Sequence, residues 1–167
     1  MPARGELDEY LPLMRRLLRG AAEDALQTRT VAVEVRRTVL DLQLATAWQE
    51  TCWRHYERVR GQVRAIRSRA GAVGVMQVNS RVWRGFYDPR FLIGDVSYNA
   101  RAGSEILVRY ALDLAFAKGE HLRAGGLDGL ARAAYAAYNG GPNDLDRFRS
   151  AREPRRARAV DARFFET

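Results

Sequence analysis

The chain has 167 residues, 47% hydrophobic and 29% charged, which is the size and composition of a single soluble globular domain. No apolar run approaches the roughly 20 residues that a membrane span needs, and the single cysteine, Cys52, cannot form a disulfide within the chain. The net charge of +8 comes almost wholly from arginine, since Lys118 is the only lysine. Such a surface attracts nucleic acid, anionic lipid and acidic wall polymers alike, so charge alone does not choose the partner.

The N-terminal residues lack the apolar run that is typical of a signal peptide. No run of seven apolar residues begins within residues 1–6, and Pro12, Arg15 and Arg16 interrupt the apolar stretch that follows. From the residues alone we expect either a cytoplasmic chain or a mature or trimmed form.

Two helices are predicted in the first third of the chain. Apolar residues at helical spacing begin at Leu7, and Gly20 is expected to end this first helix. A second, largely buried helix over about 35–56 is predicted from Val35, Val39, Leu42, Leu44, Trp48, Cys52, Trp53 and Tyr56. On it, Glu50 shares a face with Gln43 and Thr46, opposite the stripe that includes Trp48 and Cys52, so periodicity alone favours a solvated glutamate.

The rest of the chain reads as loop and helix. Periodicity fades over 61–79, where three glycines and alternating valines predict a loop with at most a small hairpin. Asp95 is the expected N-cap of a helix over 96–114, and an alanine-rich helix over 127–138 is expected to stop at residues 139–142. The scarcity of strands predicts an all-α domain.

Several kinds of site are disfavoured. Cys52 and His55 supply two potential metal ligands where a closed zinc site needs four, and His55 and His121 have no nucleophile motif beside them. The glycines over 71–74 are not followed by the Gly-Lys-Ser/Thr of a phosphate loop. We therefore expect no metal and no cofactor.

The C-terminal segment is strongly basic. Residues 147–163 hold seven arginines against Glu153 and Asp161, which could grip phosphates. Its aromatic residues are not interleaved as a base-stacking surface requires, so a solvated basic face is favoured over a nucleic-acid interface.

Three segments carry a more specific pattern. They are Ala47-Trp48-Gln49-Glu50-Thr51, Ser68-Arg69-Ala70-Gly71-Ala72-Val73-Gly74-Val75-Met76-Gln77 and Ala137-Tyr138-Asn139-Gly140-Gly141-Pro142. In this order they resemble the catalytic domain of the soluble lytic transglycosylases, a lysozyme-like family that cleaves bacterial peptidoglycan. The family motifs are a Glu-Ser pair, Ser-x-x-Gly-Ala-x-Gly-Leu-Met-Gln and Ala-Tyr-Asn-x-Gly-Pro.

The resemblance covers about residues 40–145 and has departures. Thr51 stands in place of serine, Val75 in place of leucine, and the 18 positions from Glu50 to Ser68 exceed the usual spacing. It implies one lysozyme-like domain over 1–167, with 1–28 as an N-terminal helical extension and 146–167 as a basic C-terminal segment.

The resemblance implies that Glu50 is the catalytic acid and base, and that the cleft uses Ser68, Met76, Gln77, Tyr138 and Asn139 to bind substrate. In the family the tyrosine contacts the catalytic carboxyl, so we expect Tyr138 to bond to Glu50. Trp53 could form an apolar wall that raises the pKa of this carboxyl. Structural roles stay open: a turn for Ser68, a helix C-cap for Asn139, and core packing for Tyr138 and Met76.

The implied reaction cuts the bond between N-acetylmuramic acid and N-acetylglucosamine and leaves a 1,6-anhydro end, with one glutamate performing both proton transfers. A hydrolytic muramidase like the goose-type lysozymes would use the same Glu50 with a water and a second acid, for which Asp88, Asp95 and Glu105 stay open. A non-catalytic wall-binding domain is the third alternative. The implied partner is the glycan strand of peptidoglycan, in a periplasmic or secreted location, with the oligomeric state open.

Overall fold

The computed structural model describes residue 2 and residues 4–149 and 155–165. Its longer helices are α1 (Leu7–Ala25), α2 (Val33–Thr51), α3 (Pro89–Gly94), α4 (Val96–Val108), the π-helical η2 (Arg109–Phe116), α5 (Gly126–Gly140) and α6 (Arg155–Phe165). Short 3-10 turns are η1 (Arg4–Glu6), η3 (Glu120–Leu122), η4 (Pro142–Asp144) and η5 (Arg147–Arg149). Strands β1 (Tyr56–Val59) and β2 (Gln62–Ala65) form one antiparallel hairpin, and β3 (Ala72–Val73) and β4 (Val78–Asn79) a second. A mostly helical fold with minor β-structure is confirmed.

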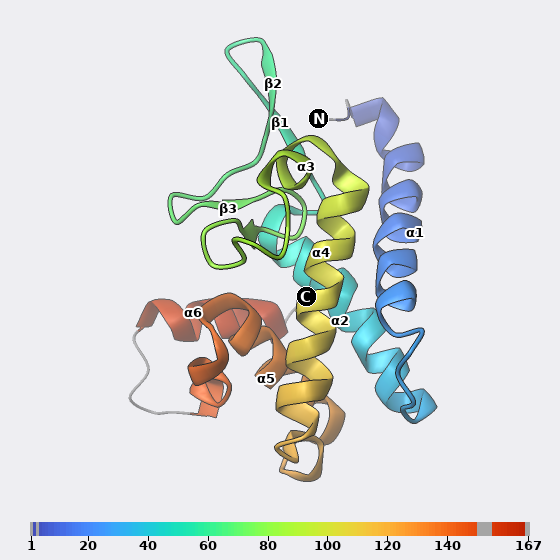
Figure 1. Cartoon of the computed structure of the whole chain (residues 1–167), viewed down its shortest axis with the longest axis vertical. Helices are drawn as coiled ribbons and strands as arrows, with labels where there is room; N and C mark the ends of the chain where they lie inside the picture. The colour runs from blue at the N-terminus through green and yellow to red at the C-terminus, as the bar shows by residue number, and fades with distance from the viewer. Residues whose placement is uncertain (1, 3, 150–154, 166–167) are drawn as a thin grey trace.

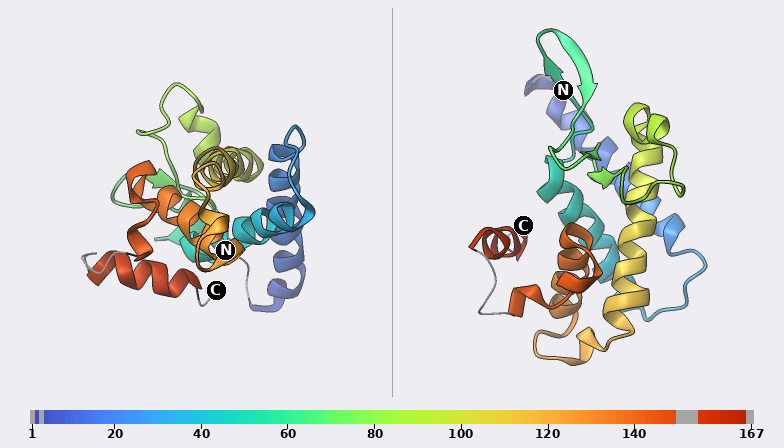
Figure 2. Two further views of the ribbon diagram at one scale, coloured as in Figure 1. Left: turned by 90° about the horizontal axis from the view of Figure 1, so that it is seen from below. Right: turned by 60° about the vertical axis from the view of Figure 1, so that its left-hand side comes forward.

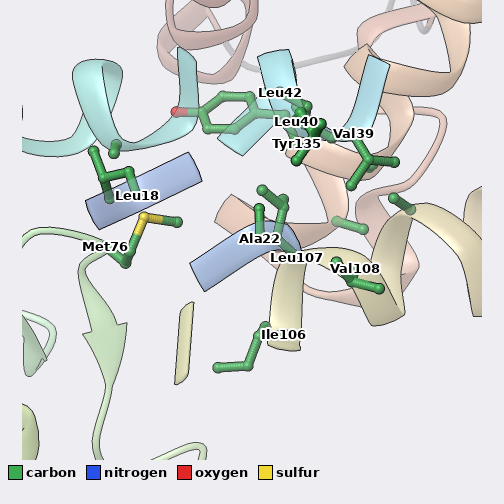
Figure 3. Packing of buried hydrophobic residues seen from close by; sticks show 14 of the residues in the cluster. Leu18, Ala22, Val39, Leu40, Leu42, Met76, Ile106, Leu107, Val108 and Tyr135 are labelled. Atoms are coloured by element: carbon green, nitrogen blue, oxygen red, sulfur yellow. The ribbon is translucent and has the colours of Figure 1, made fainter. Parts of the chain in front are cut away.

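The core lies where α1, α2, α4, η2 and α5 meet, with α4 and η2 running through the middle of the molecule (Figure 1). Figure 3 shows side chains from these helices packed together, including Leu18, Leu107 and Tyr135. Asp95 caps α4 as predicted, because its carboxylate accepts from the backbone N–H groups of Ser97 and Tyr98. Among the described helices, none is long and apolar enough to cross a bilayer.

Helix α1 continues beyond the glycine that was expected to end it. Gly20 lies inside the helix, and the buried residues Met14, Leu18 and Ala22 extend the apolar stripe on both sides of it. A glycine in a helix interior costs about 1 kcal/mol, which packing of this stripe against α2 and α4 outweighs.

Helix α2 ends earlier than predicted, and near its end it buries the face opposite to the one predicted. Cys52 takes a left-handed conformation (φ 52°) after Thr51, so the helix ends there and the chain turns toward β1, which begins at Tyr56. Trp48 is 42% exposed and Cys52 is exposed, whereas Gln43 and Thr46 are buried. The expected apolar stripe is confirmed for Val35, Val39 and Leu42, which lie in the core, and is wrong for Trp48 and Cys52. Near its end the face of α2 toward the core and the second motif carries polar side chains.

The hairpin β1–β2 accounts for the long spacing between Glu50 and Ser68. Its turn residues Arg60 and Gly61 both have positive φ (51° and 81°), as two-residue hairpin turns favour. It projects from the body of the protein (Figures 1 and 2). The chain then returns to the core, where the N–H of Ile66 donates to the His55 carbonyl over 2.9 Å.

Candidate functional site

The three motif segments surround one cleft of about 510 Å³. It lies between the end of α2, the segment from Ser68 to Trp83, and the end of α5. It is lined by Glu50, Ser68, Ala70, Ala72, Gln77, Val78, Asn79, Val82, Trp83, Ile106, Tyr110, Tyr138, Asn139, Gly140 and Gly141. Of the six predicted site residues, this cleft brings together all except Met76.

Glu50 lies in the last turn of α2 and is mostly buried. The hydroxyl of Tyr135 donates to Oε1 of Glu50 over 3.3 Å, and the amide of Asn139 lies beside the carboxyl. Burial raises the pKa of Glu50, while the Tyr135 hydroxyl, the Asn139 amide and the nearby Arg147 cation oppose that rise without cancelling it. A carboxyl with a raised pKa can hold a proton near neutral pH, which a general acid requires.

The tyrosine bonded to Glu50 is not the one that the third motif indicated. Tyr138 donates to the carbonyl of Met76 over 2.6 Å, and Tyr135 takes the predicted role. Residues three and four apart share a helix face, so Tyr135, Tyr138 and Asn139 all point to one side of α5. The prediction found the correct face of the helix and missed the residue by one turn.

Three buried polar side chains hold the second motif against α2 and α4. Thr51 donates to the carbonyl of Val75 over 3.0 Å, and Nδ1 of His55 accepts from the N–H of the same valine over 3.2 Å. Asn99 accepts from the N–H of Met76 over 3.0 Å and donates to the carbonyl of Val73 over 2.9 Å. Thr51, which departs from the motif that this segment resembles, therefore fixes this loop by its hydroxyl.

His55 serves the loop as a neutral ring. Because Nδ1 accepts a backbone hydrogen bond, the proton resides on Nε2, which donates to the carbonyl of Ile93 over 3.0 Å. Burial lowers the pKa of His55, consistent with this neutral form.

Met76 belongs to the core and not to the cleft wall. Its side chain is fully buried (Figure 3), and its sulfur accepts from Nε2 of Gln43 over 3.3 Å. A Cβ at Gly103 would lie 2.3 Å from Cβ of Met76, so α4 and the loop touch here. The expected contact of Met76 with substrate is wrong, and its backbone instead anchors Tyr138.

Ser68 and Gln77 combine a turn role with a place on the cleft. Oγ of Ser68 accepts from the N–H of Ala72 over 3.0 Å, which closes the turn before β3. Gln77 has positive φ (47°), and its Nε2 donates to the carbonyl of Gly74 over 2.9 Å. The turn contacts of Ser68 and Gln77 are thus compatible with the substrate-binding role predicted for both residues.

Glu50 is the single carboxyl among the described residues that line the cleft. The three other candidates have structural tasks: Asp88 caps α3 and pairs with Arg90, Asp95 caps α4, and Glu105 accepts from the Tyr87 hydroxyl.

Aromatic side chains that the sequence analysis did not single out form part of the wall. Trp83 comes from the loop after β4 and Tyr110 from the π-helical η2, and their rings contact edge to face with centroids 6.4 Å apart. Trp53 does not contribute to this wall. Its indole donates to the Leu44 carbonyl and lines a different hollow.

That second hollow is larger, about 700 Å³, and lies between α2, α5 and α6. It is lined mostly by apolar side chains, including Trp48 and Phe164, and its carboxylates Asp41 and Asp128 are exposed. Because Glu50 and the motif segments 68–77 and 137–142 line the smaller cleft, the chemistry is assigned there.

The basic C-terminal segment is only partly solvated. Arg147 and Asp161 are buried and paired with Nη2 to Oδ1 at 2.8 Å, and Arg149 pairs with the buried Glu120. Arg152 and Glu153 lie outside the described residues. The expectation of a solvated basic face is therefore wrong for Arg147, whose guanidinium is buried and paired with a buried carboxylate.

Comparison of the chain with protein-family models, with curated proteins and with solved structures found no match. Within the described ranges, no group of three or more His, Cys, Asp or Glu side chains is placed to hold a metal ion. The functional argument therefore depends on the cleft and on the motifs around it.

Proposed function

We propose that this protein is a peptidoglycan lytic transglycosylase that cleaves the β-1,4 bond between N-acetylmuramic acid and N-acetylglucosamine. The observation that carries the proposal is the Glu50 carboxyl, mostly buried, bonded to Tyr135 and flanked by the Asn139 amide, in the cleft that the three motif segments surround. The fold is mostly helical with minor hairpins, as the all-α expectation predicted.

Glu50 would perform two proton transfers in sequence. Protonated Glu50 donates its proton to the glycosidic oxygen as the bond to C1 of the muramic acid breaks, while the substrate's N-acetyl group stabilises the positive charge at C1. The Glu50 carboxylate then takes the proton from the C6 hydroxyl as that oxygen bonds to C1. The product is a 1,6-anhydro ring, and no water is consumed.

The two donors at Glu50 suit this cycle. Hydrogen bonds to a carboxylate are stronger than those to a neutral carboxyl, so Tyr135 and Asn139 stabilise the ionised state formed by the first transfer. Burial and the neighbouring Glu50 raise the pKa of Tyr135, which keeps its hydroxyl a donor throughout.

The single carboxyl favours a transglycosylase over a hydrolase. Hydrolytic glycosidases generally use two carboxyl groups, one as acid and the other as nucleophile or water activator. Of the described residues that line the cleft, Glu50 alone carries a carboxyl, and an intramolecular C6 hydroxyl needs no second activator. Glycan strands of the cell wall are the proposed partner, so the proposed location of the protein is outside the cytoplasmic membrane.

Digestion of purified peptidoglycan tests the assignment. Glu50→Gln should lower the rate of muropeptide release by about 10²–10⁴-fold or more while the protein stays folded, because general acid–base catalysis contributes about that factor. The matched control is Glu57→Gln, which neutralises a glutamate of the projecting hairpin that pairs with Arg64. Near-normal release by folded Glu50→Gln contradicts the proposal, and no release by the wild-type protein favours a binding domain.

A further inference from the structure

A buried arginine joins the C-terminal helix to the residues around Glu50. Arg147, in η5, donates from Nε and Nη2 to the Asp161 carboxylate of α6 over 2.8–3.2 Å. The same Nη2 donates to Oδ1 of Asn139 over 3.1 Å, and Nη1 reaches Asp144 at 3.4 Å. One guanidinium therefore contacts α6, the end of α5 and η4 at once.

The contact with Arg147 fixes which way the Asn139 amide faces. An amide has an acceptor oxygen on one side and a donor NH₂ on the other, and rotation by 180° exchanges them. Because Arg147 holds the oxygen, the NH₂ group is the side of the amide left to face the Glu50 carboxyl, which lines the same cleft. A rotated amide would direct an acceptor at the carboxylate and lose the bond from Arg147.

Helix α6 also supports the second donor. The ring of Phe164 stacks on that of Tyr135 with centroids 3.9 Å apart and planes 8° apart. Figure 2 shows α6 lying beside α5. Helix α6 thus contacts Tyr135 directly through Phe164, and it is linked to Asn139 through Arg147.

We propose that Arg147 and Asp161 form a positioning pair for Glu50, in which Asp161 fixes the guanidinium and the guanidinium fixes the Asn139 amide. The pair touches no reacting atom, and the proposal rests on the proposed role of Glu50. Buried ion pairs often add little net stability, since desolvation offsets the attraction. The function that we propose for the pair of Arg147 and Asp161 is to orient the side chains around the Glu50 carboxyl.

The effect on Glu50 has a definite sign. Tyr135, Tyr138 and Asn139 lie near the carboxyl on α5, Arg147 lies near it on η5, and Asp161 and Asp144 bond to Arg147. Removing the nearest cation and releasing the amide both weaken support for the ionised form. Loss of the pair should therefore raise the pKa of Glu50.

The test is the charge-neutral double variant Arg147→Gln/Asp161→Asn. Its matched control is Arg149→Gln/Glu120→Gln, which removes an ion pair between an exposed arginine and a buried glutamate and does not involve Asn139. Two readouts are taken: the Glu50 pKa from carboxyl NMR of the substrate-free protein, with Glu50→Gln identifying the resonance, and the pH profile of kcat. We expect the Glu50 pKa to rise and kcat to fall about 10- to 100-fold in the first variant only.

A second variant covers failure of the double variant to fold. Asp161→Asn alone removes the carboxylate that fixes the guanidinium and keeps a side chain of similar size, and it should also lower kcat. A Glu50 pKa and a kcat equal to those of the control in the folded double variant, or a wild-type kcat in Asp161→Asn if only that folds, overturn the proposal. Failure of the proposed function appears separately, as an active Glu50→Gln protein.

Discussion

Removing one hydroxyl at a time from the two tyrosines of α5 separates catalysis from folding. Tyr135→Phe deletes the donor to Glu50 and keeps a ring that stacks on Phe164. Tyr138→Phe deletes the donor to the Met76 carbonyl and keeps a ring that lines the cleft. The two variants are chemically identical changes three residues apart on one helix face.

The structure sets different magnitudes for the two. A hydrogen bond to a charged group contributes about 1.5–3 kcal/mol, and the 3.3 Å length from Tyr135 to Glu50 places this one at the lower end. Since about 1.4 kcal/mol is tenfold in rate, Tyr135→Phe should lower kcat about 10-fold with little change in stability. Tyr138→Phe leaves a buried carbonyl without its 2.6 Å donor, which costs about 1–3 kcal/mol, or roughly 2–12 °C in Tm.

Thermal unfolding and muropeptide release should be measured on the same preparations. We expect Tyr135→Phe to lose activity at nearly unchanged Tm, and Tyr138→Phe to lose Tm. Unchanged activity of Tyr135→Phe would refute the role of its hydroxyl at Glu50. A large activity loss confined to Tyr138→Phe, with Tm preserved, would restore the prediction made from the third motif.

Three further predictions concern stability. Burial raises the pKa of Glu50, so the folded state binds the proton more tightly and loses stability as pH rises from the ordinary carboxyl pKa through the raised one. Glu50→Gln should therefore gain more Tm over wild type at pH 7 than at pH 4, and a gain independent of pH would count against a raised pKa. Burial lowers the pKa of His55, so its stabilising contribution is lost as pH falls below about 6.5, and the Tm penalty of His55→Gln should shrink between pH 8 and pH 5. An unchanged penalty would exclude His55 as the titrating group. Gly74→Ala should cost about 2–5 kcal/mol, because its Cβ would lie 2.4 Å from Nδ2 of Asn99, whereas Gly61→Ala, also at positive φ but in open space, should cost about 1–2 kcal/mol. Equal costs in denaturant unfolding would show that close packing at Gly74 is unimportant.

Local signals in the sequence were sufficient for several elements. The Asp95 cap and the apolar stripe after it predicted α4 and its continuation, and the glycines after Asn139 marked the end of α5. The motifs also identified five residues that do line one cleft. These features depend on residues close together in the chain.

Features that depend on contacts between distant segments were not predictable in the same way. Gln43 and Thr46 are buried because α2 faces the loop that carries Met76, which a hydrophobic pattern cannot show. The pairing of Arg147 with Asp161 arises from the docking of α6, and in the sequence both lie in an apparently solvated basic segment. The sequence did hold a signal for Tyr135, because it lies four residues before Asn139 and such residues share a helix face.

The mass of the muropeptides released by the wild-type protein tests the central claim most directly. If Glu50 is the single acid and base and the C6 hydroxyl closes on C1, the muramic acid ends are 1,6-anhydro sugars, lighter by one water than hydrolysis products. We expect these anhydro ends to dominate and Glu50→Gln to abolish them. Predominantly reducing ends would contradict it and would assign the cleft to a hydrolytic muramidase.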